Sequence, residues 1–183
     1  MNSRFHYYLR SVKNISRSIL SSRFWAVHSP KIQSGISVEN NFFGINIAPS
    51  ADPKADDFIV ERLQELDLQH VRMNFTYDSI NGYAERLLER VIAEGFEVLL
   101  DLIPPFEDAK SFTLAAQERW KAFLNSVAKK YGQQVAYIEI GSTPNRGRWS
   151  GFEPSDYLIA WRIANDELKP LNIVLAGPNV SDF

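Results

Sequence analysis

The feature that most constrains the fold of this chain is a regular alternation, from residue 40 onward, between two kinds of segment. Short apolar runs rich in β-branched and aromatic residues are typical of buried strands, and longer stretches with apolar residues at helical spacing are typical of amphipathic helices. The pattern predicts strands at 42–47, 70–75, 96–103, 135–141 and 173–176. It predicts helices at 56–66, 83–94, 115–131 and 154–168.

Strands that alternate with helices predict a parallel sheet joined by right-handed crossovers, so the predicted fold class is α/β. Five such units fit two architectures. One is a partial or degenerate (β/α)8 TIM barrel, and the other is a five-stranded open doubly wound sheet. A partial barrel would leave two unpaired edge strands and expose interior apolar side chains. This predicts that a second copy of the chain, the basic segment at residues 1–38 folded back, or a missing carboxyl-terminal half covers them.

The charge is divided unevenly between a basic leader at residues 1–38 and a domain at residues 39–183. The leader holds six of the 20 Lys and Arg residues and no acidic residue, so its net charge is +6. The domain sets the other 14 basic residues against all 22 acidic residues, a net charge of −8, which argues against nucleic acid as a partner. An apolar helical face in the leader, at Leu9, Val12, Ile15 and Ile19, would suit contact with an anionic membrane surface; packing on the domain or disorder are the alternatives.

Several classes of site and targeting segment are not indicated by the sequence. The chain has no cysteine, and His6, His28 and His70 lie at spacings unlike those of metal ligands, so neither a metal nor a cofactor is predicted. No glycine-rich phosphate loop follows the first predicted strand, and no nucleophile-elbow pattern occurs. Without a signal peptide or membrane span, the expected location is cytoplasmic or peripheral to the inner membrane.

The fourth predicted strand and its flanks carry the most specific motifs in the chain. Trp120-Lys-Ala-Phe123 and Tyr131-Gly132 precede Val135-Ala-Tyr-Ile-Glu-Ile140, and Pro144-Asn145, Trp149 and Tyr157 follow it. In this order the motifs resemble the fourth-strand region of clan-A glycoside hydrolases, the group that contains families five and thirty-nine. The resemblance runs over residues 42–183 and implies a TIM barrel that handles a polysaccharide, with Arg72 matching the family's second-strand arginine.

The chain departs from this family where the family carries out its chemistry. Gly141, Ser142 and Thr143 stand where the family has Trp, Asn and its acid/base Glu. The Thr143 hydroxyl has no acidic pKa near neutrality and cannot protonate a leaving glycosidic oxygen. The family's nucleophile lies on a seventh strand, beyond the five units predicted here, and retaining hydrolysis needs both carboxylates.

The prediction is therefore a glycoside-hydrolase-like protein that acts on or binds an oligo- or polysaccharide and is inactive as this chain. A non-catalytic carbohydrate-binding or scaffold protein is one alternative, and a truncated fragment without independent function is another. In parallel α/β folds, functional groups gather at the carboxyl ends of the strands. The predicted substrate-binding residues lie there: Asn46, Arg72, Asn74, Tyr77, Asn145, Trp149 and Asn179.

Two of the charged residues near this edge have an internal alternative. Glu139 lies four residues before Thr143, roughly 13 Å deeper along an ideal strand, so it is expected to be buried. Buried carboxylates need partners, which predicts an ion pair between Arg72 and Glu139, while Arg72 could instead bind a ligand carboxylate. Trp149 and Tyr77 are the aromatic candidates for packing against sugar rings.

Overall fold

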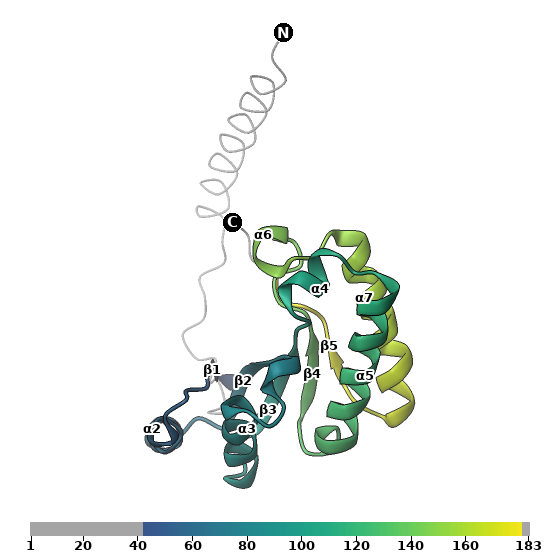
Figure 1. Ribbon diagram of the computed structural model, residues 1–183. Helices are drawn as coiled ribbons and strands as arrows, with labels where there is room; N and C mark the ends of the chain where they lie inside the picture. Colours follow the sequence, from purple (N-terminus) through teal and green to yellow (C-terminus); the bar gives the residue numbers. More distant parts are fainter. Residues whose placement is uncertain (1–41, 181–183) are drawn as a thin grey trace, which may run out of the picture. The chain divides into compact units, whose positions relative to one another are not determined.

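The computed structural model describes residues 42–180, which form one parallel sheet and its helices (Figure 1). The leader expected at residues 1–38 lies outside the described residues. The strands are β1 (Gly44–Asn46), β2 (His70–Phe75), β3 (Glu97–Leu102), β4 (Tyr137–Ile140) and β5 (Leu175–Ala176). The longer helices are α2 (Pro53–Glu65), α3 (Tyr83–Ala93), α5 (Leu114–Tyr131) and α7 (Pro154–Leu168). The predicted α/β class with alternating parallel strands and helices is confirmed.

The strands lie in the order β1-β2-β3-β4-β5, and every neighbouring pair is parallel. Each crossover therefore moves the chain by one strand in the same direction. Because parallel crossovers are right-handed, a sequential order places the connecting helices on one face of the sheet. Within the described sheet, β1 and β5 each have a single neighbour.

The helix-covered face of the sheet is the apolar core. Alternate residues of the three central strands are at most 2% exposed: Val71, Met73, Phe75, Val98, Leu100, Leu102, Ile138 and Ile140. They belong to one cluster with buried residues of α3, α5 and α7, including Leu87, Leu124 and Ala164. Because side chains alternate across a strand, the remaining strand residues face the other, open side of the sheet.

Capping residues explain where two of the helices begin. The prediction started the first helix at residue 56, but α2 begins at Pro53 because the Asp52 carboxylate accepts a hydrogen bond from the Lys54 amide at 3.0 Å. Proline at this position adds no unsatisfied amide. Thr113 similarly caps α5 through the Ala116 amide, at 3.4 Å.

The outer strands are shorter than predicted. The segments 42–47 and 173–176 contain strands of three and two residues, respectively. Apolar patterning marks a buried segment, whereas strand ends depend on where hydrogen bonds to a neighbour stop, which a sequence pattern does not record.

Exposed large apolar side chains gather around β1 and α2 and include Phe42, Phe43, Ile45, Phe58 and Leu66.

Two short helices lie in the loops that follow β3 and β4. They are α4 (Phe106–Lys110) and α6 (Gly147–Ser150), and they pack against one another near the carboxyl ends of the strands (Figure 1). A third short element, the 3-10 turn η2 (Tyr77–Ser79), follows β2. Among residues 42–180, no helix has the length and apolarity required to cross a bilayer.

Candidate functional site

Strand register places polar residues of four strands side by side on the open face. Asn46 of β1 is aligned with Arg72 of β2, and Asn74 of β2 is aligned with Asp101 of β3. Asp101 is in turn aligned with Glu139 of β4. Because parallel strands share one direction, all of these side chains lie toward the carboxyl end of the sheet.

The Arg72 guanidinium is the centre of this group. Its Nε donates to Glu139 Oε2 at 2.7 Å, and its Nη2 donates to Asp101 Oδ2 at 2.6 Å. Its Nη1 donates to Asn46 Oδ1 at 3.1 Å and to Asn74 Oδ1 at 3.0 Å. The side chain of Arg72 is 22% exposed, and those of Asp101 and Glu139 are 0% and 4% exposed. The structure thus contains the internal Arg72–Glu139 pair, with Asp101 as a second carboxylate on the same guanidinium.

Glu139 is held on its other side by the segment after β5. The Asn179 amide donates to Glu139 Oε1 at 2.7 Å, so both carboxylate oxygens of Glu139 are engaged. The Asn179 side-chain oxygen accepts from the Thr143 amide at 2.8 Å and from the Ser142 hydroxyl at 3.2 Å. We call Asn46, Arg72, Asn74, Asp101, Glu139 and Asn179 the polar cluster.

The turn after β4 has an unusual backbone conformation. Gly141 has φ of 73°, and Thr143 has φ of 46°. A left-handed conformation suits glycine but is strained for a β-branched residue such as Thr143. The bonds of Ser142 and Thr143 to Asn179 hold this strained turn in place.

Burial and charge pairing act against each other in the polar cluster. Burial raises the pKa of Asp101 to about 7, the Arg72 charge opposes this rise, and the Glu139 charge adds to it. Asp101 Oδ1 is buried without a hydrogen-bond partner among the described residues, which adds to the cost of the charged carboxylate. Burial works against the charged form of Arg72, but its hydrogen bond to Glu139 and the charge of Asp101 raise its pKa overall.

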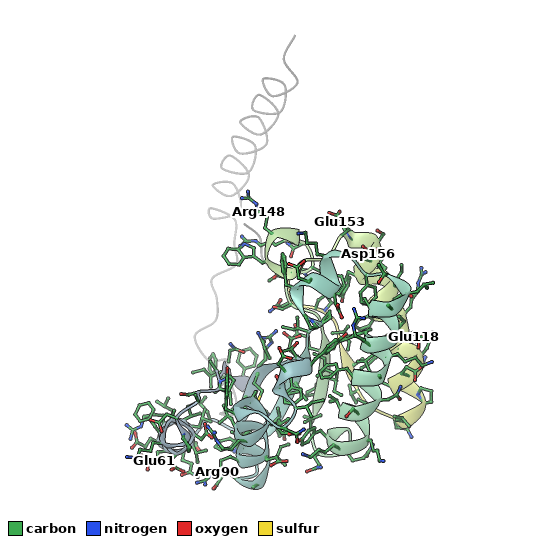
Figure 2. All side chains as sticks on the ribbon, in the orientation of Figure 1. Glu61, Arg90, Glu118, Arg148, Glu153 and Asp156 are labelled. Atoms are coloured by element: carbon green, nitrogen blue, oxygen red, sulfur yellow. The ribbon has the colours of Figure 1, made fainter. Side chains whose placement is uncertain are left out.

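Tyr77 and Trp149 belong to the predicted site residues but form none of the hydrogen bonds of the polar cluster. Tyr77 is half-buried and packs against Phe123, with ring centroids 4.9 Å apart, and burial raises the pKa of its hydroxyl. Asn145 is exposed in the turn before α6, and Trp149 on α6 is 74% exposed. Arg148, from the same short helix, projects outward (Figure 2). Trp149 is available to a ligand, whereas the Tyr77 ring belongs largely to the core.

A pocket next to the cluster brings in residues that the sequence analysis did not single out. It has a volume of about 430 Å³. It is lined by Pro49, Asn74, Thr76, Asp78, Ser79, Tyr83 and Ala84. Asp78 and Tyr83 follow β2 in the chain, so the rule that loops after parallel strands carry function was the one signal that could have found them.

A second hollow lies on the outer side of β1 and is mainly apolar. It has a volume of about 310 Å³ and runs between β1 and α2, where Ile45, Phe58 and Leu66 contribute to its walls. No group of three or more metal-ligating side chains occurs within residues 42–180.

Models of known protein families give no match to this chain, and a search of curated proteins likewise gives none. The resemblance to clan-A glycoside hydrolases therefore stays a prediction that depends on the motifs around β4 and on Arg72.

Proposed function

We propose that this chain is a partial (β/α)8 barrel of the clan-A glycoside hydrolase type that binds an oligo- or polysaccharide without hydrolysing it. The observation that carries the proposal is the polar cluster, with exposed amides at Asn46 and Asn74 on the open carboxyl end of the sheet. Amides and guanidinium groups are suited to sugar hydroxyls, and an exposed aromatic such as Trp149 suits the apolar face of a sugar ring.

The strand order supports a barrel over a doubly wound sheet. A doubly wound sheet reverses its strand order once, which places helices on both faces and a binding crevice at the reversal. The sequential order β1 to β5 contains no reversal. The side chains on the open face are polar toward the carboxyl ends of the strands. In a barrel this face is the interior, and the cluster would lie at its catalytic end.

The state of the carboxylates supports binding without turnover. Glu139 uses both oxygens within the protein, and Asp101, although its pKa is about 7, is 0% exposed. A general acid must come within hydrogen-bond reach of the leaving oxygen. Neither carboxyl group meets this condition as the cluster is arranged, and Thr143 supplies no substitute.

The test is a thermal unfolding titration of the whole chain with neutral and acidic oligosaccharides, combined with an assay for new reducing ends. We expect at least one oligosaccharide to raise the unfolding midpoint without the appearance of new reducing ends. Trp149→Ala should weaken binding about fivefold, because an aromatic contact is worth about 1 kcal/mol. Phe58→Ala, which removes an exposed aromatic from α2, is the matched control and should leave the affinity unchanged.

Two results would count against the proposal. If no oligosaccharide shifts the midpoint, carbohydrate binding is wrong. If new reducing ends appear with the wild-type chain, and disappear in Glu139→Gln, the inactive assignment is wrong and Glu139 acts as a catalytic residue.

A further inference from the structure

The pocket that contains Asn74, described above, has one wall formed by the segment after β2, and hydrogen bonds fix that segment. The Thr76 amide donates to the Ser79 hydroxyl at 2.9 Å, and the Ser79 amide donates to the Thr76 carbonyl at 2.9 Å. The Asn81 amide donates to the buried Glu85 carboxylate at 2.6 Å. Because these bonds fix the wall before any ligand arrives, little ordering is required on binding. We call this hollow the Tyr83 pocket.

Three groups that line the Tyr83 pocket have hydrogen-bonding capacity to spare. Tyr83 is 51% exposed at the first position of α3, and its hydroxyl bonds to no other group within residues 42–180. Asp78 is exposed and forms no ion pair with any described residue. The Asn74 side-chain oxygen accepts a hydrogen bond from Arg72, so its amide nitrogen remains as a donor for a ligand.

This combination of groups selects a class of ligand. An aromatic face, a carboxylate acceptor and an amide donor together match a sugar ring, which has an apolar C–H face and hydroxyls at its edge. Asp78 is the single charged residue among those lining the pocket, so an anionic unit would meet repulsion there. The pocket volume of about 430 Å³ falls within the range of about 300 to 1,000 Å³ that is usual for small-ligand sites.

We propose that the Tyr83 pocket is a subsite for one neutral sugar unit of the bound saccharide. The Tyr83 ring packs against the C–H face of this unit, Asp78 accepts hydrogen bonds from its hydroxyls, and the Asn74 amide donates to a ring substituent. This inference rests on the proposed function and adds to it the position and charge class of one sugar unit. Through Asn74, which also bonds Arg72, the subsite is continuous with the polar cluster.

The experiment is calorimetric titration of the whole chain with neutral hexose oligosaccharides and with uronic acid oligosaccharides of equal length. We expect the neutral series to bind more tightly. Tyr83→Ala and Asp78→Asn should each weaken binding of the neutral series about tenfold. The first removes a ring contact, and the second removes a charge-assisted hydrogen bond. Tyr83→Phe keeps the ring and should retain most of the affinity.

Asp166→Asn, an exposed charge change on α7, is the matched control and should bind as the wild type does. Thermal unfolding of each variant verifies folding, and little loss is expected because Tyr83 and Asp78 are exposed. Unchanged affinity in both Tyr83→Ala and Asp78→Asn, with Trp149→Ala still weakened, would overturn the subsite and leave the proposed function standing. Tighter binding of the acidic series would overturn its neutral character. A wild-type chain that binds neither series would refute the proposed function and the subsite with it.

Discussion

Asp101 is the residue whose environment departs most from that of an ordinary carboxylate. Its side chain is fully buried on β3, one of its oxygens bonds the Arg72 guanidinium, and the other has no partner among the described residues. Burial and the neighbouring Glu139 charge outweigh the attraction of Arg72 and raise the pKa of Asp101 to about 7. The folded protein therefore holds a proton on Asp101 at pH values where the unfolded chain has released it.

This difference predicts a pH dependence of stability with a definite sign. Between pH 4, near the unfolded pKa, and pH 7, the folded state binds more protons at Asp101, so its contribution to stability falls as pH rises, by about 1.4 kcal/mol per pH unit. Above pH 7 this dependence ends. Urea unfolding of the wild type and of Asp101→Asn at several pH values measures it, since the difference between the two slopes isolates Asp101. Parallel curves for the two proteins would show that Asp101 is already ionised in the folded state.

At the scale of elements, the packing of α5 against α7 is anchored by one tryptophan. Trp120 is fully buried on α5, and its Nε1 donates to the Ala160 carbonyl on α7 at 3.1 Å. Its ring contacts Phe123 at a centroid distance of 5.8 Å. At the solvent side of the same interface, Lys121 and Asn125 both bond Glu167. The two helices lie side by side in Figure 1.

Truncation of this anchor should weaken the fold far more than truncation of its partly exposed counterpart on α7. Trp120→Ala is expected to lower the free energy of unfolding by about 3 to 5 kcal/mol, because it leaves a large cavity and an unused carbonyl partner. Trp161→Ala is the matched control. Because Trp161 packs at the edge of the core, this variant should lose clearly less free energy of unfolding than Trp120→Ala does. Denaturant unfolding of both variants provides the comparison, and equal losses would contradict the interface described here.

The sequence predicted the elements well wherever the apolar period is long. The segments that became β2, α3, α5 and α7 have clear two-residue or 3.6-residue periods, and their predicted bounds lie within one residue of the observed ones. The gathering of polar residues at one end of the sheet also followed from the sequence, because parallel strands end at a common edge. The lengths of the edge strands β1 and β5 were overestimated, because the ends of a strand depend on where its hydrogen bonds to a neighbour stop.

The geometry of the site could be predicted only in part. The need of a buried carboxylate for a partner predicted the pair of Glu139 with Arg72, but no pattern could show that Asn179 would bind the second Glu139 oxygen. The left-handed Thr143 was also missed, since a β-branched residue is among the least expected at positive φ. Asp78 and Tyr83 were missed because the Tyr83 pocket is made by a turn and a helix start, which have no apolar period.

At the scale of the whole molecule, the polar cluster ties together most of the sheet. Arg72 of β2 bonds residues of β1, β3 and β4, and Glu139 of β4 extends the network to Asn179 beyond β5. The cluster exposes little of its charge to water, and its single, partly buried cation faces the carboxyl groups of Asp101 and Glu139, both of which are charged above pH 7. Removal of the cation would leave those carboxylates without a counter-charge.

Arg72→Met should therefore lower the free energy of unfolding by about 3 to 5 kcal/mol, the usual loss when one partner of a buried ion pair is removed. Adding Asp101→Asn and Glu139→Gln to the same variant should restore a substantial part of that loss, because no uncompensated charge then remains. Urea unfolding of the single and triple variants tests both statements. A single variant as stable as the wild type would mean that water enters the cluster freely.

The reach of Arg72 across the sheet also bears on how the chain unfolds. A sheet in which every strand pairs with its chain neighbour could come apart one strand–helix unit at a time, as repeat proteins do. Arg72 bonds Glu139, 67 residues away, over the intervening strand β3, so β2 and β4 are coupled although they are not neighbours. Opening either strand breaks the same ion pair, so we expect the central strands to unfold together rather than one strand–helix unit at a time.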